Sequence, residues 1–489
     1  GEGIFIDEII KSDNTLHIDA LDIDEKAISV LQTKYKDNAQ ITVRLTDTLL
    51  DEKLDQYGTM SLFLKQSDTL LDEQLDMFGM IGGHYDRVIG NPPYGAWQDP
   101  ERRDLLKKRY AGHYVKETYS LFMLRCISVL KKGGRMSFIV PDTFMFLNMH
   151  RKLRELLLTK TKIDEILIFP SKFFPGVSFG YSNLSIITLE RCDSKEALEH
   201  QVRIIKGFRD SSEFEYTFRK ETEYPEYLQV FHLKQKDILV NAQARFVLAE
   251  ATNIDLLNSE TVTLGDVADI VTGFYTGNNK RFIKALSANV KGSKGYQFIE
   301  DGQVFECVSN EGIDTDGEGY VPYIKSSSKQ RYVRGEDEWF VQWDKPTIHF
   351  YQSDKKARFQ NSQFYFKTGV GIPMVKSSSI RAFLMEKRVF DQSIVGIFPK
   401  NREDLYYILA LMNSDAINKL IHVINPTANN SSNYVKLLPF ITPNLEQRKQ
   451  IEENVKRIIS LQREGKNNDV DKLHDEINSI ITKLYEMAM

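Results

Sequence analysis

The first 191 residues of this 489-residue chain combine strand-like and helix-like hydrophobic patterns. Residues 16–23 and 41–45 alternate apolar and polar positions, and apolar residues recur at helical spacing between them. Further strand patterns lie at 85–89, 136–140 and 185–189, and residues 118–130 have a helix pattern. Strands and helices in this alternation predict an α/β domain with a doubly wound sheet, in which 185–189 is the last strand.

The pattern changes after residue 191. Charged residues with scattered aromatics dominate residues 192–255, which favours a connecting region. Residues 256–443 contain short strand patterns and polar glycine turns, as in an α+β domain. Residues 444–489 have two apolar stripes at helical spacing with Gly465 between them. They predict a helical hairpin that packs against its own domain, with a subunit contact as the less favoured alternative.

Composition and charge narrow the function classes. Of all residues 42% are hydrophobic and 27% charged, as in globular proteins, and no apolar run reaches the length of a membrane span. Residues 1–90 have an acidic excess, whereas residues 321–400 have 14 Lys and Arg against 7 Asp and Glu. A DNA duplex would bind the second region, although a solvated basic face is an alternative. The three cysteines form no metal or disulfide spacing, so we expect a cytoplasmic protein without a metal.

The most informative segment is Asn91-Pro92-Pro93-Tyr94, which follows the strand pattern at 85–89. Two prolines fix φ of successive residues and hold the residue before each in extended geometry. The Asn91 amide and the Pro92 carbonyl can therefore lie side by side as acceptors for one NH2 group, which would free its lone pair for attack on a methyl group. Tyr94 would stack on the base that carries the amine. A strand-ending turn is the alternative interpretation.

Residues near the N-terminus have the spacing of a nucleotide-type cofactor site. Gly1 and Gly3 match the end of a glycine-rich loop that approaches a cofactor closely. Asp22 ends the first strand pattern, where an acid usually binds ribose hydroxyls. The segment Thr46 to Glu52 recurs almost unchanged as Ser67 to Glu73. Either Asp47 or Asp68 is therefore the candidate acid for the adenine side of the cofactor, and spacing from Asp22 favours Asp47.

In this order, the motifs resemble those of TaqI-type DNA adenine-N6 methyltransferases and of type IIG-like restriction-modification proteins with their own target-recognition domain. The resemblance implies a Rossmann-like methyltransferase domain at 1–191 that uses S-adenosylmethionine, with Asn91, Pro92 and Tyr94 in the catalytic site. It also implies that Phe174, in Lys172-Phe173-Phe174-Pro175, packs against a flipped-out adenine. A core phenylalanine is an equal alternative for Phe174.

The second half resembles target-recognition domains from Thr263 onward. The polar turn at 276–281 contains Lys280 and Arg281, which can contact DNA phosphate. Later basic candidates for contacts with double-stranded DNA are Lys325, Lys355, Lys356 and Arg358. The resemblance predicts site-specific adenine methylation within a restriction-modification or phage-defence system.

Two observations leave alternatives open. The chain begins inside the glycine loop, so we expect the preceding strand to come from a longer chain or a partner subunit, with a nuclease as a further candidate. Methylation of an RNA base or of a protein glutamine also suits the Asn-Pro-Pro-Tyr turn, although the long C-terminal domain argues against glutamine. A DNA-binding specificity subunit with an inactive methyltransferase domain is the third alternative, against which the intact Asn91, Pro92, Tyr94 and Asp22 argue.

Overall fold

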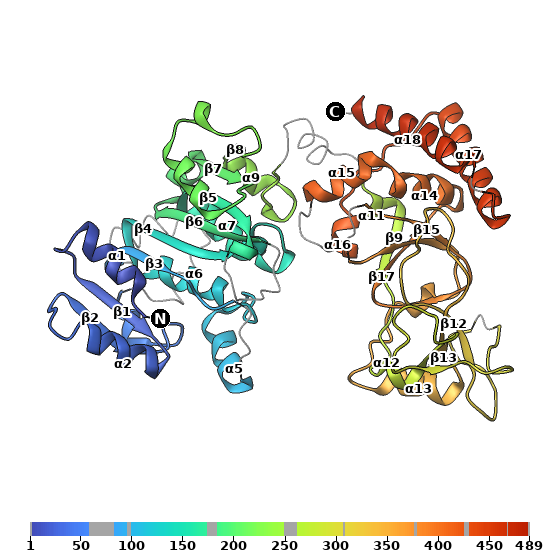
Figure 1. The fold of residues 1–489 in the computed structure, drawn as a ribbon, viewed down its shortest axis with the longest axis horizontal. Coiled ribbons are helices and arrows are strands. Elements are labelled where there is room, and N and C mark those ends of the chain that lie inside the picture. The colour runs from blue at the N-terminus through green and yellow to red at the C-terminus, as the bar shows by residue number, and fades with distance from the viewer. Residues whose placement is uncertain are drawn as a thin grey trace. The chain divides into compact units, whose positions relative to one another are not determined.

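The chain forms two compact units, residues 1–248 and 249–489 (Figure 1). The computed structural model describes residues 2–57, 83–94, 99–173, 183–248, 262–306, 309–375, 379–424, 430–466 and 468–487. The predicted site residues Gly1, Asp68 and Phe174 lie outside these ranges. Among the described residues, no helix has both the length and the apolar character needed to cross a membrane.

The first unit begins with a small layer of two parallel strands, β1 (Ile18–Asp22) and β2 (Ile41–Leu45). Helix α2 (Glu25–Lys34) connects them, and its N-cap is Asp24, whose side chain accepts a hydrogen bond from the Lys26 N–H. Helix α1 (Ile4–Ser12) precedes this layer. The two strands and the helix α2 confirm the predictions from hydrophobic spacing.

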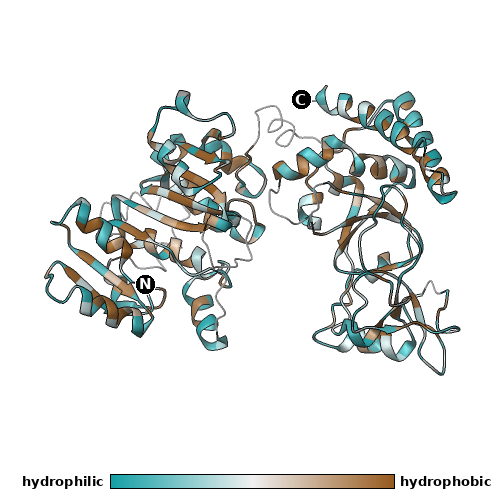
Figure 2. Cartoon of the chain, in the orientation of Figure 1, coloured by the Kyte–Doolittle hydropathy of each residue, from teal (hydrophilic) through white to brown (hydrophobic). Residues whose placement is uncertain are grey.

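A six-stranded sheet forms the centre of the first unit, in the order β3-β4-β6-β5-β7-β8 (Figure 1). Its strands are β3 (Tyr85–Gly90), β4 (Leu130–Pro141), β5 (Thr161–Pro170), β6 (Asn183–Arg191), β7 (Gln201–Lys206) and β8 (Gln229–Lys234). The helices are α5 (Pro100–Arg109), α6 (Thr118–Val129), α7 (Arg151–Lys160), α8 (Ser194–Glu199) and α9 (Gln235–Val240). The pair β3–β4 is parallel, so both strands end at the same edge of the sheet. The strands are strongly hydrophobic (Figure 2), and all of α6 except Phe122 is buried against them.

Two expectations about this sheet are wrong. Strand β6, which contains 185–189, is not the last strand but lies between β4 and β5 and is antiparallel to both. Residues 192–248 belong to the first unit and do not form a connecting region, because β7 pairs with β5 and β8 pairs with β7. The physical reason is that Val202 and Ile204, hidden among charged residues in the sequence, are completely buried against the sheet.

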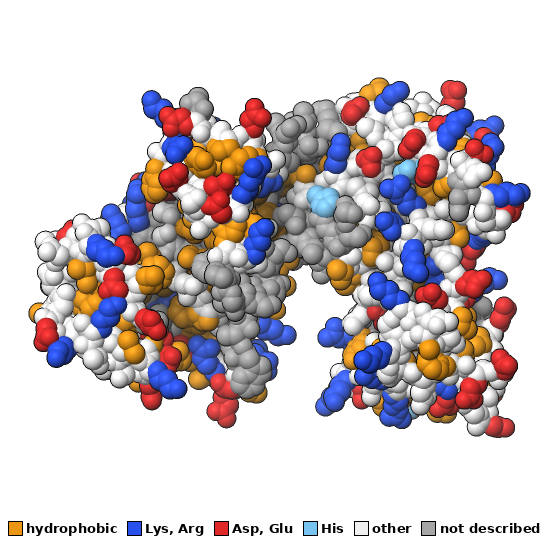
Figure 3. Space-filling model, viewed as in Figure 1, with side chains coloured by type: hydrophobic (Ala, Val, Ile, Leu, Met, Phe, Trp, Pro, Cys, Tyr) orange, Lys and Arg blue, Asp and Glu red, His pale blue; other side chains and the backbone are white. Residues whose placement is uncertain are grey.

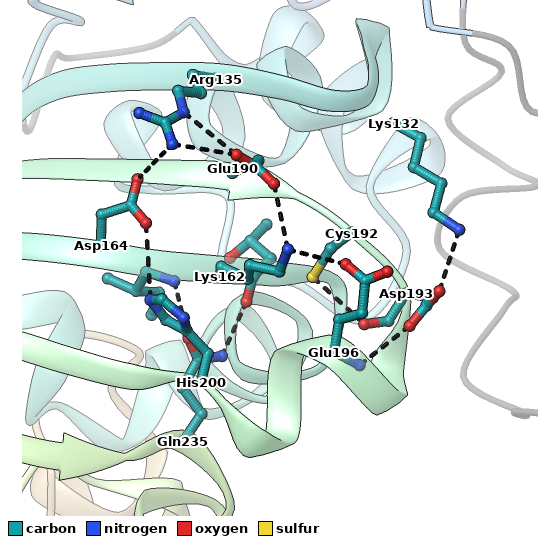
Figure 4. A network of polar contacts seen from close by, with 12 residues as sticks. Lys132, Arg135, Lys162, Asp164, Glu190, Cys192, Asp193, Glu196, His200 and Gln235 are labelled. Atoms are coloured by element: carbon teal, nitrogen blue, oxygen red, sulfur yellow. Dashed lines mark hydrogen bonds and ion pairs between the residues drawn. The ribbon is translucent and has the colours of Figure 1, made fainter.

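Charged side chains link three strands at the end of the sheet where β4 and β5 begin (Figure 4). Arg135 on β4 pairs with Glu190 on β6 at 3.2 Å, and Lys162 on β5 pairs with the same carboxylate at 3.3 Å. Asp164 lies 3.6 Å from the His200 ring nitrogen. These contacts lie at the end of the sheet away from Asn91, which follows the other end of β3, and partly exposed ion pairs of this kind contribute at most about 1 kcal/mol each.

The described residues of the second unit form two smaller sheets. One has the order β11-β10-β13-β12-β16 and the other β15-β14-β17-β9. Their strands are β9 (Ala268–Thr272), β10 (Ile283–Ala285), β11 (Gln297–Phe298), β12 (Tyr320–Ile324), β13 (Trp339–Gln342), β14 (Gly369–Pro373), β15 (Phe383–Met385), β16 (Val389–Phe390) and β17 (Ile394–Pro399). Phe274 is completely buried and contacts the rings of Tyr323, Trp343 and Tyr351, so that aromatic packing supports the first sheet.

Helices complete the second unit. Short helices α11 (Leu264–Val267), α12 (Asn279–Phe282), α13 (Lys345–Ser353) and α16 (Ser432–Val435) accompany the strands, and α14 (Leu405–Asn413) and α15 (Asp415–Ile424) follow them. The predicted hairpin is α17 (Leu445–Arg463) and α18 (Val470–Glu486), which pack on α14 and α15. His474 on α18 shares a 2.7 Å hydrogen bond with Tyr332, and Tyr485 donates to the Pro439 carbonyl at 2.6 Å. The hairpin therefore packs against its own domain, as predicted.

Candidate active site and DNA-contact surface

The Asn91 turn lies at the carboxyl end of β3, directly beside β4. The Tyr94 hydroxyl donates a hydrogen bond to Asn91 Oδ1 and also lies 3.0 Å from the Ile139 carbonyl oxygen on β4. The Thr118 hydroxyl, at the start of α6, donates to the Pro93 carbonyl at 2.7 Å. Pro92 is buried, whereas Asn91 is exposed. The turn is thus held from both sides while its amide remains accessible.

Tyr94 is a hydrogen-bond donor at neutral pH. Burial raises the pKa of its hydroxyl to about 12, so that the group keeps its proton. A carbonyl oxygen has two lone pairs, and the hydroxyl occupies one of those on Asn91 Oδ1. Asn91 can therefore accept a second hydrogen bond, from an amino group, without losing its contact with Tyr94.

A buried polar group supports the turn from behind, and no sequence motif indicates it. Tyr119 packs edge-on against Tyr94, with ring centroids 6.5 Å apart. Its hydroxyl lies 3.0 Å from both Thr143 Oγ1 and His150 Nε2. Burial, with a smaller contribution from the Arg154 charge, lowers the pKa of His150 to about 3. The imidazole is therefore neutral, and its Nε2 can accept a hydrogen bond from the Tyr119 hydroxyl when the ring proton is on Nδ1.

Aromatic residues extend the site along the neighbouring strands. Tyr94 and Phe173 pack against the same apolar cluster, which includes Phe169 at the end of β5. Phe173 stacks on Phe169 at 5.7 Å between centroids and approaches Phe214 at 6.2 Å. The fold thus brings the segment that precedes Phe174 to the cluster that Tyr94 contacts. The predicted role of Phe174 itself remains a prediction, because that residue lies outside the described ranges.

The candidate cofactor residues differ in their surroundings. Asp22 ends β1, is half-exposed, and its Oδ1 accepts a hydrogen bond from the Asp24 N–H at 3.0 Å. Gly3 has φ 83°, and a Cβ there would meet the Tyr35 hydroxyl at 2.6 Å, so helix packing already requires glycine. Asp47 receives two hydrogen bonds from Arg102, at 2.8 and 3.2 Å.

The acidic segment after β2 also has a structural role that sequence spacing missed. Arg125 on α6 is completely buried and donates to Asp55 Oδ1 at 2.8 Å and to the Asp51 carbonyl at 2.8 Å. Arg109 on α5 contacts Asp55 as well, at 2.5 Å. A buried guanidinium requires such partners. Part of the acidic character of residues 46–55 is therefore explained by the arginines of two helices.

The basic residues predicted to contact DNA come together on the second unit. A backbone bridge joins Tyr275 and Arg358, which places the turn at 276–281 beside the loop at 354–358. Lys and Arg side chains gather over α12 and α13 (Figure 3). Five of the six candidates are exposed: Lys280, Arg281, Lys355, Lys356 and Arg358.

Lys325, the sixth candidate, is half-buried at the end of β12. Its ammonium lies 3.7 Å from the ring centroid of Tyr296 and 3.5 Å from that of Trp339. Burial lowers the pKa of Lys325 to about 8, although the nearby Asp391 charge acts in the opposite direction. The structure thus distinguishes Lys325, which is held by two aromatic rings, from the other five candidates, which are exposed. No sequence pattern indicates this difference.

Comparisons with known proteins agree with the motifs. Residues 15–174 match the family model described as Eco57I restriction-modification methylase. Adenine-specific methyltransferase BrxX of Escherichia coli O9:H4 (strain HS) is 22% identical over 377 residues, which cover 75% of this chain and 28% of BrxX. Type II methyltransferase M.HincII of Haemophilus influenzae is 31% identical over 134 residues, or 24% of this chain and 26% of that protein. The chain therefore spans about a quarter of the length of these two relatives.

A solved structure shares the fold across both units. The Type IIL restriction-modification enzyme MmeI, solved in complex with DNA, superposes with a TM-score of 0.54 at 12% identity, covering 95% of this chain and 63% of MmeI. This likeness concerns the fold, and it confirms the prediction of a Rossmann-like unit followed by an α+β unit. Residues 15–174, which include the Asn91 turn, are thus similar to the Eco57I restriction-modification methylase family.

Proposed function

We propose that this protein is a site-specific DNA methyltransferase that transfers a methyl group from S-adenosylmethionine to N6 of a flipped-out adenine. The observation that carries the proposal is the Asn91 amide at the carboxyl end of β3, held by Tyr94 with one lone pair still available. The names of the relatives support adenine as the substrate base. The fold of the second unit and its basic surface support duplex DNA as the partner.

The chemistry follows from the acceptors in the turn. The N6 amino group of adenine has two hydrogens, and binding both of them to Asn91 Oδ1 and the Pro92 carbonyl would localise the nitrogen lone pair for attack. Inside a duplex this nitrogen is paired and stacked, so the base must leave the helix, at a cost of a few kcal/mol. Stacking on Tyr94 offsets part of that cost, since stacking contributes about 1–3 kcal/mol per base.

Residues of the first unit suit the proposed cofactor. Asp22 ends β1 with a half-exposed carboxylate, a suitable acceptor for ribose hydroxyls. Ile23, beside it, is 60% exposed, and Leu45 at the end of β2 is 50% exposed, so both offer apolar surface to an adenine ring. S-adenosylmethionine would supply an electrophilic methyl group at the strand ends. Asp47 is a weaker candidate than its spacing predicts, because Arg102 already binds its carboxylate.

A transfer assay tests the proposal. The purified protein is incubated with tritium-labelled S-adenosylmethionine and DNA from a host without adenine methylation, with total RNA as a parallel substrate. We expect label in N6-methyladenine after digestion of the DNA to nucleosides, and none with the variant Asn91→Ala. Label in RNA alone would favour the RNA-base alternative. Cofactor binding without transfer to any substrate, under conditions where DNA binds, would instead favour an inactive methyltransferase domain.

A further inference from the structure

Lys325 differs from the other basic candidates of the second unit in its surroundings, because two aromatic rings contact its ammonium. The Lys325 ammonium lies 3.7 and 3.5 Å from the ring centroids of Tyr296 and Trp339. The two rings meet edge to face, with centroids 5.0 Å apart and planes at 76°. Arg281 also lies near aromatic rings, at 4.8 Å from Phe282, but its side chain is exposed. Lys325 alone among the six candidates is half-buried.

Contacts hold both the backbone and the ammonium of Lys325. Its backbone carbonyl accepts a 2.9 Å hydrogen bond from the Ser393 hydroxyl, and the strand before it pairs with β13 and β16. The two aromatic rings hold the ammonium at the other end. A lysine side chain normally loses up to about 2 kcal/mol of rotamer entropy when it is immobilised. In Lys325 the contacts with the two rings restrict this freedom before any ligand binds.

The half-buried Tyr296 ring lies next to the exposed cations, whereas Trp339 is buried. Lys280 Nζ lies 3.2 Å from the point where Gly295 would carry a Cβ, next to Tyr296 in the chain. The loop at 354–358 is joined to the turn that precedes Lys280 through the Tyr275–Arg358 bridge. Lys325 therefore lies among the candidate phosphate contacts and not in a separate part of the unit.

A cation held in one position suits contact with a base edge, whereas a flexible, exposed cation suits contact with phosphate. Phosphates are present at every step of the backbone and can be followed by exposed, flexible side chains. A base edge presents its acceptors at one position only, as with O6 and N7 of guanine in the major groove, and a preplaced donor discriminates best there. An ammonium has three N–H donors, so that contact with two ring faces leaves at least one for an acceptor.

We propose that Lys325 is a base-reading residue of the target site, which donates a hydrogen bond to a base acceptor in the major groove, while the exposed cations contact phosphate. The proposal rests on the proposed function, since it assumes that the second unit selects the methylated sequence. Tyr296 and Trp339 act as positioning residues that hold the ammonium.

The test compares Lys325→Met with the matched control Lys355→Met. Methionine keeps most of the aliphatic stem and removes the charge in both variants. Lys355 is an exposed lysine of the same surface. For each protein we would sequence all methylated adenines in DNA from expressing cells. We would also measure the salt dependence of duplex binding, and check folding by circular dichroism and thermal unfolding.

The expected results differ in kind. Methylation of the wild-type site, divided by methylation of sites that differ from it at one base pair, should fall about ten-fold or more in Lys325→Met. The consensus sequence of this variant should then no longer specify the base at that position. Lys355→Met should keep the consensus and reduce the salt slope by about one. Lys325→Arg, which keeps the charge but not the shape, should also change the consensus at that position.

Two results would overturn the assignment of Lys325. A folded and active Lys325→Met protein with the wild-type consensus and a reduced salt slope would make Lys325 a phosphate contact. The wild-type consensus with an unchanged salt slope would make the lysine a packing element between two rings. A wild-type protein that methylates no adenine would instead refute the proposed function, so the two failures are distinguishable.

Discussion

His150 makes the first unit sensitive to acid, because this buried imidazole lies behind the Asn91 turn and ionises less readily there than in the unfolded chain. Its ring nitrogen bonds the Tyr119 hydroxyl at 3.0 Å, and only 1% of the residue is exposed. Burial lowers its pKa to about 3 in the folded state. In the unfolded chain the pKa is about 6.5.

The sign and size of the effect follow from these two values. Between pH 6.5 and pH 3 the unfolded chain binds more protons than the folded protein, so folding stability falls as the pH falls. Relative to pH 8, His150 alone should lower the free energy of unfolding by about 2 kcal/mol at pH 5 and by about 4–5 kcal/mol at pH 3.

Urea unfolding at pH 8 and pH 5, followed by circular dichroism, measures this difference. The variant His150→Gln removes the titrating group and should lose about 2 kcal/mol less than the wild type between the two pH values. His17→Gln, at an exposed position, is the matched control and should behave as the wild type. An equal pH dependence in the wild type and His150→Gln would show that His150 does not titrate in this way, and the account of the buried Tyr119–His150 contact would be wrong.

Three further predictions concern function. Asn91→Ala should reduce methyl transfer about 100-fold or more, the usual effect of losing one preorganised contact worth ~3 kcal/mol, with unchanged DNA affinity in a gel-shift assay; wild-type turnover would contradict it. Asp22→Ala should weaken S-adenosylmethionine binding in calorimetry without changing the methylated sequence, and an unchanged affinity would remove Asp22 from the cofactor site. The double variant Lys355→Met, Lys356→Met should weaken binding to all duplexes and lower the salt slope by about two, whereas a loss confined to one sequence would assign these lysines to base contacts.

Short-range rules determined much of this protein from its sequence. The alternating and helical hydrophobic patterns predicted β1, α2, β2 and α6 correctly. Each of these patterns depends only on residues that are close together in the sequence. The Asn91 turn was readable for the same reason, since two prolines restrict the backbone locally. The order of Asp22, Asn91 and the later segments then indicated the family, and the family match over residues 15–174 agrees.

Tertiary structure decided what depends on partners distant in sequence. Asp47 and Asp22 both end strand patterns, yet only the fold places Arg102 against Asp47, 55 residues away. The sequence predicted residues 201–206 as part of a connecting region, and only the fold shows that Val202 and Ile204 are buried in β7, between β5 and β8. Lys325 and Lys355 cannot be distinguished in the sequence. In the structure Tyr296 and Trp339 pack against the Lys325 ammonium, whereas Lys355 is exposed. Burial and ion pairing depend on long-range contacts, whereas secondary structure and turns are encoded by neighbouring residues.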